Sequence, residues 1–195
     1  DSNSKLTPYL RKQESATQLV VDGKPFLVLG GELHNSSSSN SEYMRPIWER
    51  LVALKLNTVL AAVSWELIEP EEGVFDFSLI DGLIQDARRH DLQLIFLWFG
   101  SWKNGMSSYI PLWVKQNYRR FPRIKLQDGQ TVEVLSTLAE ANWQADARAF
   151  AALMHHIREV DGSEHTVIMM QVENEVGVLG CLLYTSDAAD DLTRV

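Results

Sequence analysis

Two carboxylic acids lie close together near the end of the chain, in the run Gln171-Val172-Glu173-Asn174-Glu175. The run follows an apolar segment, residues 166–172, that is predicted to be a buried strand. Side chains two residues apart point to one side of a strand, so Glu173 and Glu175 are expected to share a cavity. Carboxylates that share a cavity repel each other as they ionise, which raises one pKa and suits a general acid. Spacing does not say which glutamate is the acid, and it equally allows a strand that has ended with both glutamates solvated.

The elements that position these acids alternate between apolar strands and amphipathic helices. Strands are predicted at residues 24–29, 58–65, 92–99 and 166–172, with helices starting near Ser41 and Ser78 and another over 142–160. A small hairpin turning at Asp22-Gly23 is expected to lead into the first strand, which stops at Gly30-Gly31. Residues 101–140 are less regular, with a short helix over 111–118 and a hairpin around Asp128-Gly129, and are interpreted as an inserted active-site loop.

Four strand-helix alternations imply a parallel α/β sheet, either doubly wound or half of a barrel. No GxGxxG or Walker-type glycine loop follows a strand, and polar or aromatic residues gather at the C-terminal ends of all four strands, which favours the barrel. A complete barrel takes about 250 residues. The chain is therefore predicted to be the truncated N-terminal half of a (β/α)8 TIM barrel, with about four β/α units.

Composition narrows the class of ligand. The chain has 195 residues, 45% of them hydrophobic, and a formal net charge of -8, which argues against nucleic acid or an anionic membrane as partner and favours a neutral ligand. The single cysteine, Cys181, excludes an intrachain disulfide and a cysteine-based metal site. His155 and His156 are adjacent on a predicted helix, cannot share a face as a metal pair, and are expected on the surface. No metal and no cofactor are expected.

The sequence resembles glycoside hydrolase family 35, within the clan A of retaining (β/α)8 enzymes, over residues 19–180. Residues 171–177 are similar to the family's QxENEYG signature. The resemblance implies that Glu175 is the general acid/base and that Asn174 hydrogen-bonds the sugar 2-hydroxyl, a contact that strengthens in an oxocarbenium-like transition state. Strand period leaves Asn174 facing away from Glu175, so a twist or bulge is expected at the strand end.

Other segments carry the same resemblance with departures. Residues 65–70 are similar to the WNxHEP segment with Glu66 in place of Asn, and residues 31–35 to GxxHY with Asn35 in place of Tyr. Residues 99–105 replace the common GPYxCAEW stretch, and the chain matches again at 110–113. These departures indicate a divergent, bacterial subgroup, and they bear on galactose selectivity more than on the retaining mechanism.

Several residues are candidates for substrate contact. Trp102 can stack on a sugar ring, Lys103 and Asn104 can donate to hydroxyl groups, and Glu32 can accept from them at a barrel mouth. The alternatives are core packing for Trp102, solvated loop positions for Lys103 and Asn104, and a loop-capping contact for Glu32. The predicted substrate-binding set is Asn174, Glu32, Asn35, Trp65, Glu66, Trp102, Lys103, Asn104 and Glu173.

The leading hypothesis is retaining hydrolysis of terminal β-galactosides by a longer parent protein. Its two carboxylates would be about 5 Å apart, with the nucleophile on a later strand outside this chain, so the fragment alone is expected to be inactive. The alternatives are another clan A β-glycosidase acting on β-arabinosides, β-glucosides or β-mannosides, a carbohydrate-binding protein without catalysis, and a metal-dependent hydrolase.

The expected organisation is an N-terminal extension (residues 1–17), a partial catalytic domain (18–180) and a non-native tail (181–195). The expected partners are a β-galactoside or related oligosaccharide and the missing C-terminal half of the barrel. Localisation stays open, with a bacterial periplasmic or secreted protein ahead of a cytoplasmic one.

Overall fold

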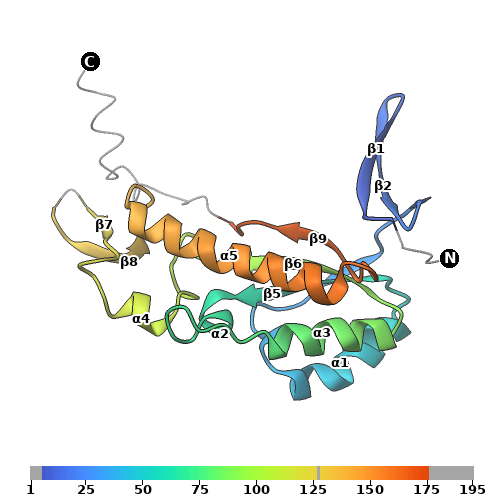
Figure 1. Cartoon of the computed structure of the whole chain (residues 1–195), viewed down its shortest axis with the longest axis horizontal. Coiled ribbons are helices and arrows are strands. Elements are labelled where there is room, and N and C mark those ends of the chain that lie inside the picture. The colour runs from blue at the N-terminus through green and yellow to red at the C-terminus, as the bar shows by residue number, and fades with distance from the viewer. Residues whose placement is uncertain (1–5, 127, 176–195) are drawn as a thin grey trace. The chain divides into compact units, whose positions relative to one another are not determined.

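The computed structural model describes residues 6–126 and 128–175, whose strands form three sheets (Figure 1). The chain divides into two compact units. The described residues of the first are 6–63, 77–97 and 154–171, and those of the second are 64–76, 98–126, 128–153 and 172–175. The predicted boundaries at residues 17 and 180 stay predictions, and the expected tail, 181–195, lies outside the described residues.

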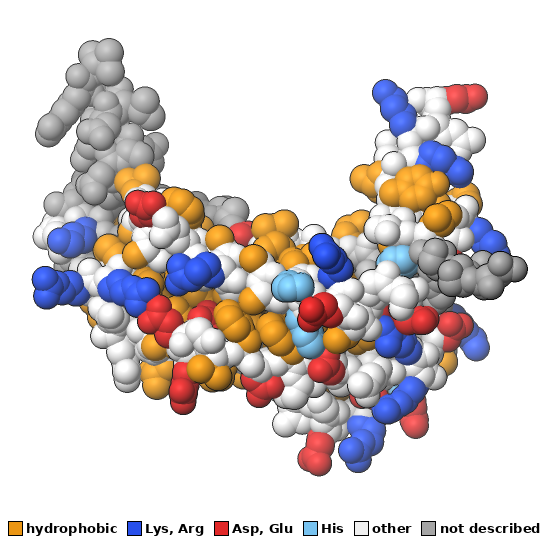
Figure 2. Space-filling view, viewed as in Figure 1, with side chains coloured by type: hydrophobic (Ala, Val, Ile, Leu, Met, Phe, Trp, Pro, Cys, Tyr) orange, Lys and Arg blue, Asp and Glu red, His pale blue; other side chains and the backbone are white. Residues whose placement is uncertain are grey.

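The first unit begins with an antiparallel hairpin of β1 (Tyr9–Gln13), β2 (Ala16–Val21) and β3 (Lys24–Pro25). Its β2–β3 turn lies at Asp22-Gly23, as predicted, and both residues have the positive φ of a tight hairpin turn, 49° and 76°. Figure 2 shows hydrophobic side chains on the surface of this hairpin.

The prediction of a strand over residues 24–29 is wrong. Only Lys24–Pro25 pairs, and the first parallel strand, β4 (Gly30–Glu32), starts where the predicted strand was to stop. The reason is the side chain of Asn57, which accepts from the backbone N–H of Leu29 at 2.8 Å and donates to the carbonyl of Leu27 at 2.9 Å. These backbone groups are therefore satisfied by an amide side chain and need no strand partner.

The central sheet is parallel, in the order β4-β5-β6-β9, with β5 at Thr58–Ser64, β6 at Gln93–Phe99 and β9 at Val167–Gln171. β4 pairs in parallel with β5, and β6 pairs in parallel with β9. Nearly every residue of β5 and β6 is buried, as expected for strands covered on both faces. This arrangement confirms the predicted parallel α/β sheet, and the described strands do not close into a barrel.

Three longer helices follow strands, as predicted: α1 (Ser41–Ala53), α3 (Ser78–Arg89) and α5 (Glu140–Asp161). The cap of α1 is Asn40, whose side chain accepts from the N–H of Tyr43 at 2.9 Å. α1 and α3 lie side by side in the first unit (Figure 1). No helix in the described part of the chain combines the length and apolar character needed to cross a membrane.

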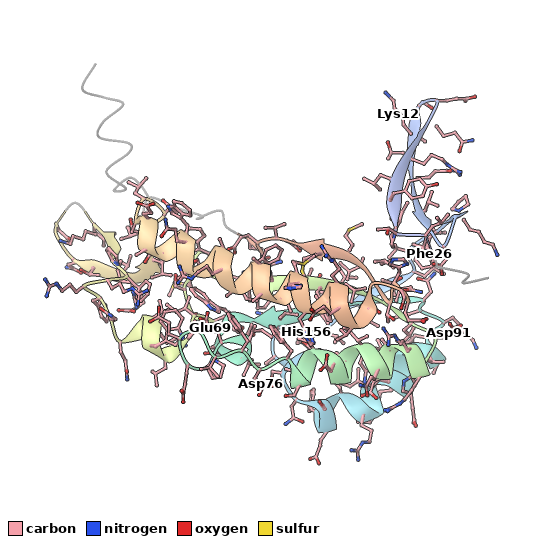
Figure 3. The ribbon with its side chains drawn as sticks, viewed as in Figure 1. Lys12, Phe26, Glu69, Asp76, Asp91 and His156 are labelled. Atoms are coloured by element: carbon pink, nitrogen blue, oxygen red, sulfur yellow. The ribbon has the colours of Figure 1, made fainter. Side chains whose placement is uncertain are left out.

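His156, expected on the surface, is instead 18% exposed on the C-terminal half of α5 (Figure 3). Its Nε2 lies 2.6 Å from Asp81 Oδ1 on α3, and its ring stacks on Phe77 with centroids 4.2 Å apart. The histidine therefore joins α5 to the start of α3, while neighbouring His155 is 67% exposed.

The second unit holds the short helices α2 (Trp65–Ile68) and α4 (Leu112–Lys115) and the antiparallel hairpin of β7 (Arg123–Lys125) and β8 (Thr131–Leu135). The remaining element, η1 (Ser37–Ser39), belongs to the first unit. α4 lies within the helix predicted over residues 111–118 but is shorter, and the β7–β8 hairpin flanks Asp128-Gly129, as predicted.

Candidate active site

Most of the predicted site residues belong to the second unit. Glu32 and Asn35 are in the first unit, where Glu32 is exposed on β4 and Asn35 is half-buried in the following loop. Their predicted sugar contacts stay predictions. The other predicted site residues come from α2, from residues 102–104 and from residues 173–175.

The two glutamates of the signature have different surroundings. β9 ends at Gln171 and the chain then bends, so strand period no longer applies at residues 173–175. Glu173 is half-buried and Asn174 is buried, whereas the Glu175 side chain is 56% exposed. Glu175 also has a φ of 52°, in the left-handed region that residues other than glycine rarely adopt. Strand alternation therefore does not apply to the two glutamates, because β9 has already ended at Gln171, and the cavity that they were expected to share stays a prediction.

A raised pKa, predicted for one of the two acids, falls on Glu173. Burial is the main cause and the nearby Asp146 carboxylate is the second, and together they raise the pKa of Glu173 to about 9. The expected cause was repulsion between the two signature glutamates. The like charge that acts on Glu173 instead comes from α5.

Asp146 is a site residue that sequence reasoning missed. It is 6% exposed, and its carboxylate accepts from Trp98 Nε1 at 2.7 Å and from the backbone N–H of Ser101 at 2.6 Å. Between these donors stands Gly100, where an added Cβ would lie within 2.6 Å of both Asp146 oxygens and 2.3 Å from Trp98 Nε1. The signal was an acid on an apolar helix face, since Asp146 lies four residues before Phe150.

Lys103 lies beside the exposed glutamate. Its side chain is only 8% exposed, its Nζ forms an ion pair with the Glu175 carboxylate, and the same Nζ is 5.0 Å from the ring centroid of Phe99. A tight turn at Asn104-Gly105, both with positive φ, brings Lys103 N within 2.8 Å of the Met106 carbonyl. Gly105 N also donates to the Glu175 carbonyl at 3.3 Å.

The two predicted tryptophans are held by their indole N–H groups. Trp102 is half-buried and donates to the carbonyl of Leu135 on β8 at 3.2 Å. Trp65 is fully buried and donates to Glu69 Oε2 at 2.8 Å, so its ring belongs to the core. Its predicted part in substrate binding stays a prediction.

Glu69, labelled in Figure 3, is a buried carboxylate of the segment that follows β5. Besides Trp65, it accepts from the N–H of Gly73 at 2.8 Å, and its carbonyl accepts from Trp113 Nε1 at 3.0 Å. Glu66, which is partly exposed, pairs with Lys115 Nζ at 2.9 Å. Glu69 thus holds Trp65, Gly73 and Trp113 together by hydrogen bonds, whereas Glu66 forms a partly exposed ion pair.

A cluster of three or more His, Cys, Asp or Glu side chains able to hold a metal ion is absent from residues 6–126 and 128–175. Acidic and basic side chains are interspersed over the face shown in Figure 2. The acids of the candidate site contact protein N–H groups, the Asp146 carboxylate and the Lys103 cation.

A parallel α/β sheet with acids just beyond a strand end is an arrangement shared by barrel hydrolases. Residues 18–194 match the model of Glycosyl hydrolases family 35, and the chain belongs to that family. It is 29% identical over 207 residues to "Beta-galactosidase" from Xanthomonas manihotis, covering 91% of this chain and 32% of that protein. It is 31% identical over 169 residues to "Beta-galactosidase-1-like protein 3" from Homo sapiens, covering 81% of this chain and 23% of that protein. The chain thus spans a third or less of the length of these relatives.

The fold is similar to that of an endo-1,4-beta-mannanase from Rhizomucor miehei, with a TM-score of 0.56 and 15% sequence identity. The alignment covers 85% of this chain and 48% of that structure. At this identity the likeness concerns the fold alone. Together with the four parallel strands, it confirms the prediction of a partial (β/α)8 barrel.

Proposed function

We propose that this chain is part of a retaining glycoside hydrolase that removes terminal β-galactosides, with Glu175 as its general acid/base. The observation that carries the proposal is that the two acids of the signature, Glu173 and Glu175, have different surroundings. Glu173 is held near the buried Asp146, while Glu175 is exposed beside a cation. Of the two, only Glu175 has most of its side chain open to a substrate. Family membership and the two β-galactosidase relatives support the reaction and the sugar.

In this mechanism Glu175 first gives its proton to the leaving glycosidic oxygen and then takes a proton from the water that completes hydrolysis. Lys103 is placed to neutralise the carboxylate that exists between these two steps. The nucleophile is a second carboxylate about 5 Å away, supplied by a later strand of the complete barrel. The chain by itself is therefore proposed to be inactive.

For substrate binding we propose Trp102, Lys103 and Asn104 as one side of the sugar site, next to Glu175. Asn104 is exposed, and Lys103 and Gly105 contact Glu175, so this turn and the acid/base share one surface of the second unit. Asn174 is proposed to reach the sugar 2-hydroxyl. Its Oδ1 is buried and has no hydrogen-bond partner within the described part of the chain, and this unsatisfied acceptor supports the proposed contact.

A panel of nitrophenyl glycosides tests the reaction and the sugar together. With the complete protein we expect the β-D-galactoside to be cleaved with a higher kcat/KM than the β-arabinoside, β-glucoside and β-mannoside. Faster cleavage of one of the others would assign the site to that sugar. Sugar binding without cleavage of any glycoside would contradict the hydrolase and favour a binding protein. The 195-residue chain, tested alongside, is expected to cleave none of them.

A further inference from the structure

Asp146 is a buried carboxylate that the proposed mechanism does not use. Each of its two oxygens accepts a hydrogen bond, one from Trp98 Nε1 and one from Ser101 N. Both donors belong to the same short segment at the end of β6. Because both oxygens already act as acceptors, Asp146 is suited to the accepting side of any further hydrogen bond.

Glu173 belongs to the segment 172–175, and its side chain lies near that of Asp146. Its Oε2 is buried and, taken as an ionised oxygen, has no hydrogen-bond donor among residues 6–126 and 128–175. Backbone hydrogen bonds from Ser101 and Asn174 lower the pKa of this carboxyl group, but by less than burial and Asp146 raise it. A buried anionic oxygen without a donor, next to a second carboxylate, is unfavourable because desolvation and repulsion act in the same direction. A proton on Glu173 removes both costs, because its hydroxyl can then donate to Asp146 and the two side chains together carry one negative charge. The pKa of Glu173, about 9, agrees with this arrangement.

We propose that Glu173 is a neutral carboxylic acid whose hydroxyl donates to Asp146, and that this carboxyl pair is a positioning device for Glu175. The pair connects residues 172–175 to α5 and, through Trp98 and Ser101, to the end of β6. Glu175 follows two residues later with a left-handed φ of 52°. Such a conformation persists only where the surroundings impose it, and the anchored Glu173 supplies one side of that constraint.

Infrared difference spectroscopy of the 195-residue chain at pH 7 tests the protonation without any need for activity. We expect the C=O stretch of a neutral carboxylic acid, shifted when the chain is made with 13C-labelled glutamate and absent from Glu173→Gln. Glu49→Gln, the same change at an exposed residue of α1, is the control and keeps the band. If Glu173→Gln does not fold, the labelled wild-type chain still decides. The absence of the band, or its shift only on labelling of aspartate, would overturn the proposal.

The positioning role rests on the proposed function of Glu175, and it is tested by kinetics of the complete protein. Glu173→Gln keeps a neutral side chain that can donate to Asp146, whereas Glu173→Leu keeps only the size. We expect the kcat/KM of Glu173→Leu to lie on the order of a hundredfold below that of Glu173→Gln, through misplacement of Glu175. We also expect Glu173→Gln to lose the alkaline decline of activity near pH 9. Equal kcat/KM for the two variants would overturn the positioning role. An inactive wild-type protein would refute the proposed function and leave the infrared result standing.

Discussion

Replacement of Gly100 by alanine is expected to break the cluster around Asp146. The new Cβ would lie 2.3 Å from Trp98 Nε1 and 2.5 and 2.6 Å from the two Asp146 oxygens, and Trp98 and Asp146 are both buried. Overpacking of this kind costs about 1–3 kcal/mol. Separation of Asp146 from one of its donors adds about 1.5–3 kcal/mol, since the acceptor is charged. The free energy of unfolding should therefore fall by roughly 2.5–6 kcal/mol.

The assay is thermal unfolding of the 195-residue chain followed by circular dichroism. In a chain of this size each kcal/mol lowers Tm by about 2–4 °C, so the expected loss is on the order of 10 °C. Gly82→Ala on α3 is the matched control, because its new Cβ would meet only Ser41 Oγ at 3.5 Å, an ordinary contact, and alanine favours a helix. Equal Tm values for the two variants would refute the tight packing inferred at Gly100.

Two further outcomes follow from the same cluster. The folded chain holds the Glu173 proton up to about pH 9, whereas the unfolded chain releases it near the ordinary value of 4.5, so the free energy of unfolding should fall as pH rises between these values. Urea unfolding at several pH values should show a flatter slope for Glu173→Gln. An unchanged slope would contradict the assignment. Trp98→Phe removes a donor to a carboxylate and should lower the free energy of unfolding by about 1.5–3 kcal/mol beyond the effect of the lost ring volume. Trp113→Phe removes a donor to a carbonyl and should lower it by only about 0.5–1.5 kcal/mol beyond that effect. A larger loss for Trp113→Phe would count against a charged Asp146.

The strands that carry the site were predictable because their signal is local. Residues 58–65 and 92–99 are short, apolar runs bounded by turn residues, and β5 and β6 match them to within one residue at each end. The first parallel strand was misplaced because Asn57, far along the chain, satisfies the backbone of residues 27–29. A side-chain contact that takes the place of strand pairing cannot be detected from the periodicity of residues 24–29.

For the candidate site, the sequence indicates residue types but not their arrangement. The signature singled out Glu173 and Glu175, but strand period could not indicate that β9 ends at Gln171 and that the two acids then differ in burial. Asp146 was readable only as an acid on an apolar helix face. Its partner Ser101 lies 45 residues away, and a contact of that separation is set by tertiary packing.

The central claim is that Glu175 is the acid/base, and the leaving group of the substrate tests it most directly. In the complete protein, Glu175→Gln should lower kcat/KM by about 10²–10⁴ for a β-galactoside whose leaving alcohol needs a proton. An activated dinitrophenyl leaving group departs without that proton, so formation of the glycosyl-enzyme from it should be nearly unaffected. An equal loss with both substrates, or no loss with either, would contradict the assignment of Glu175.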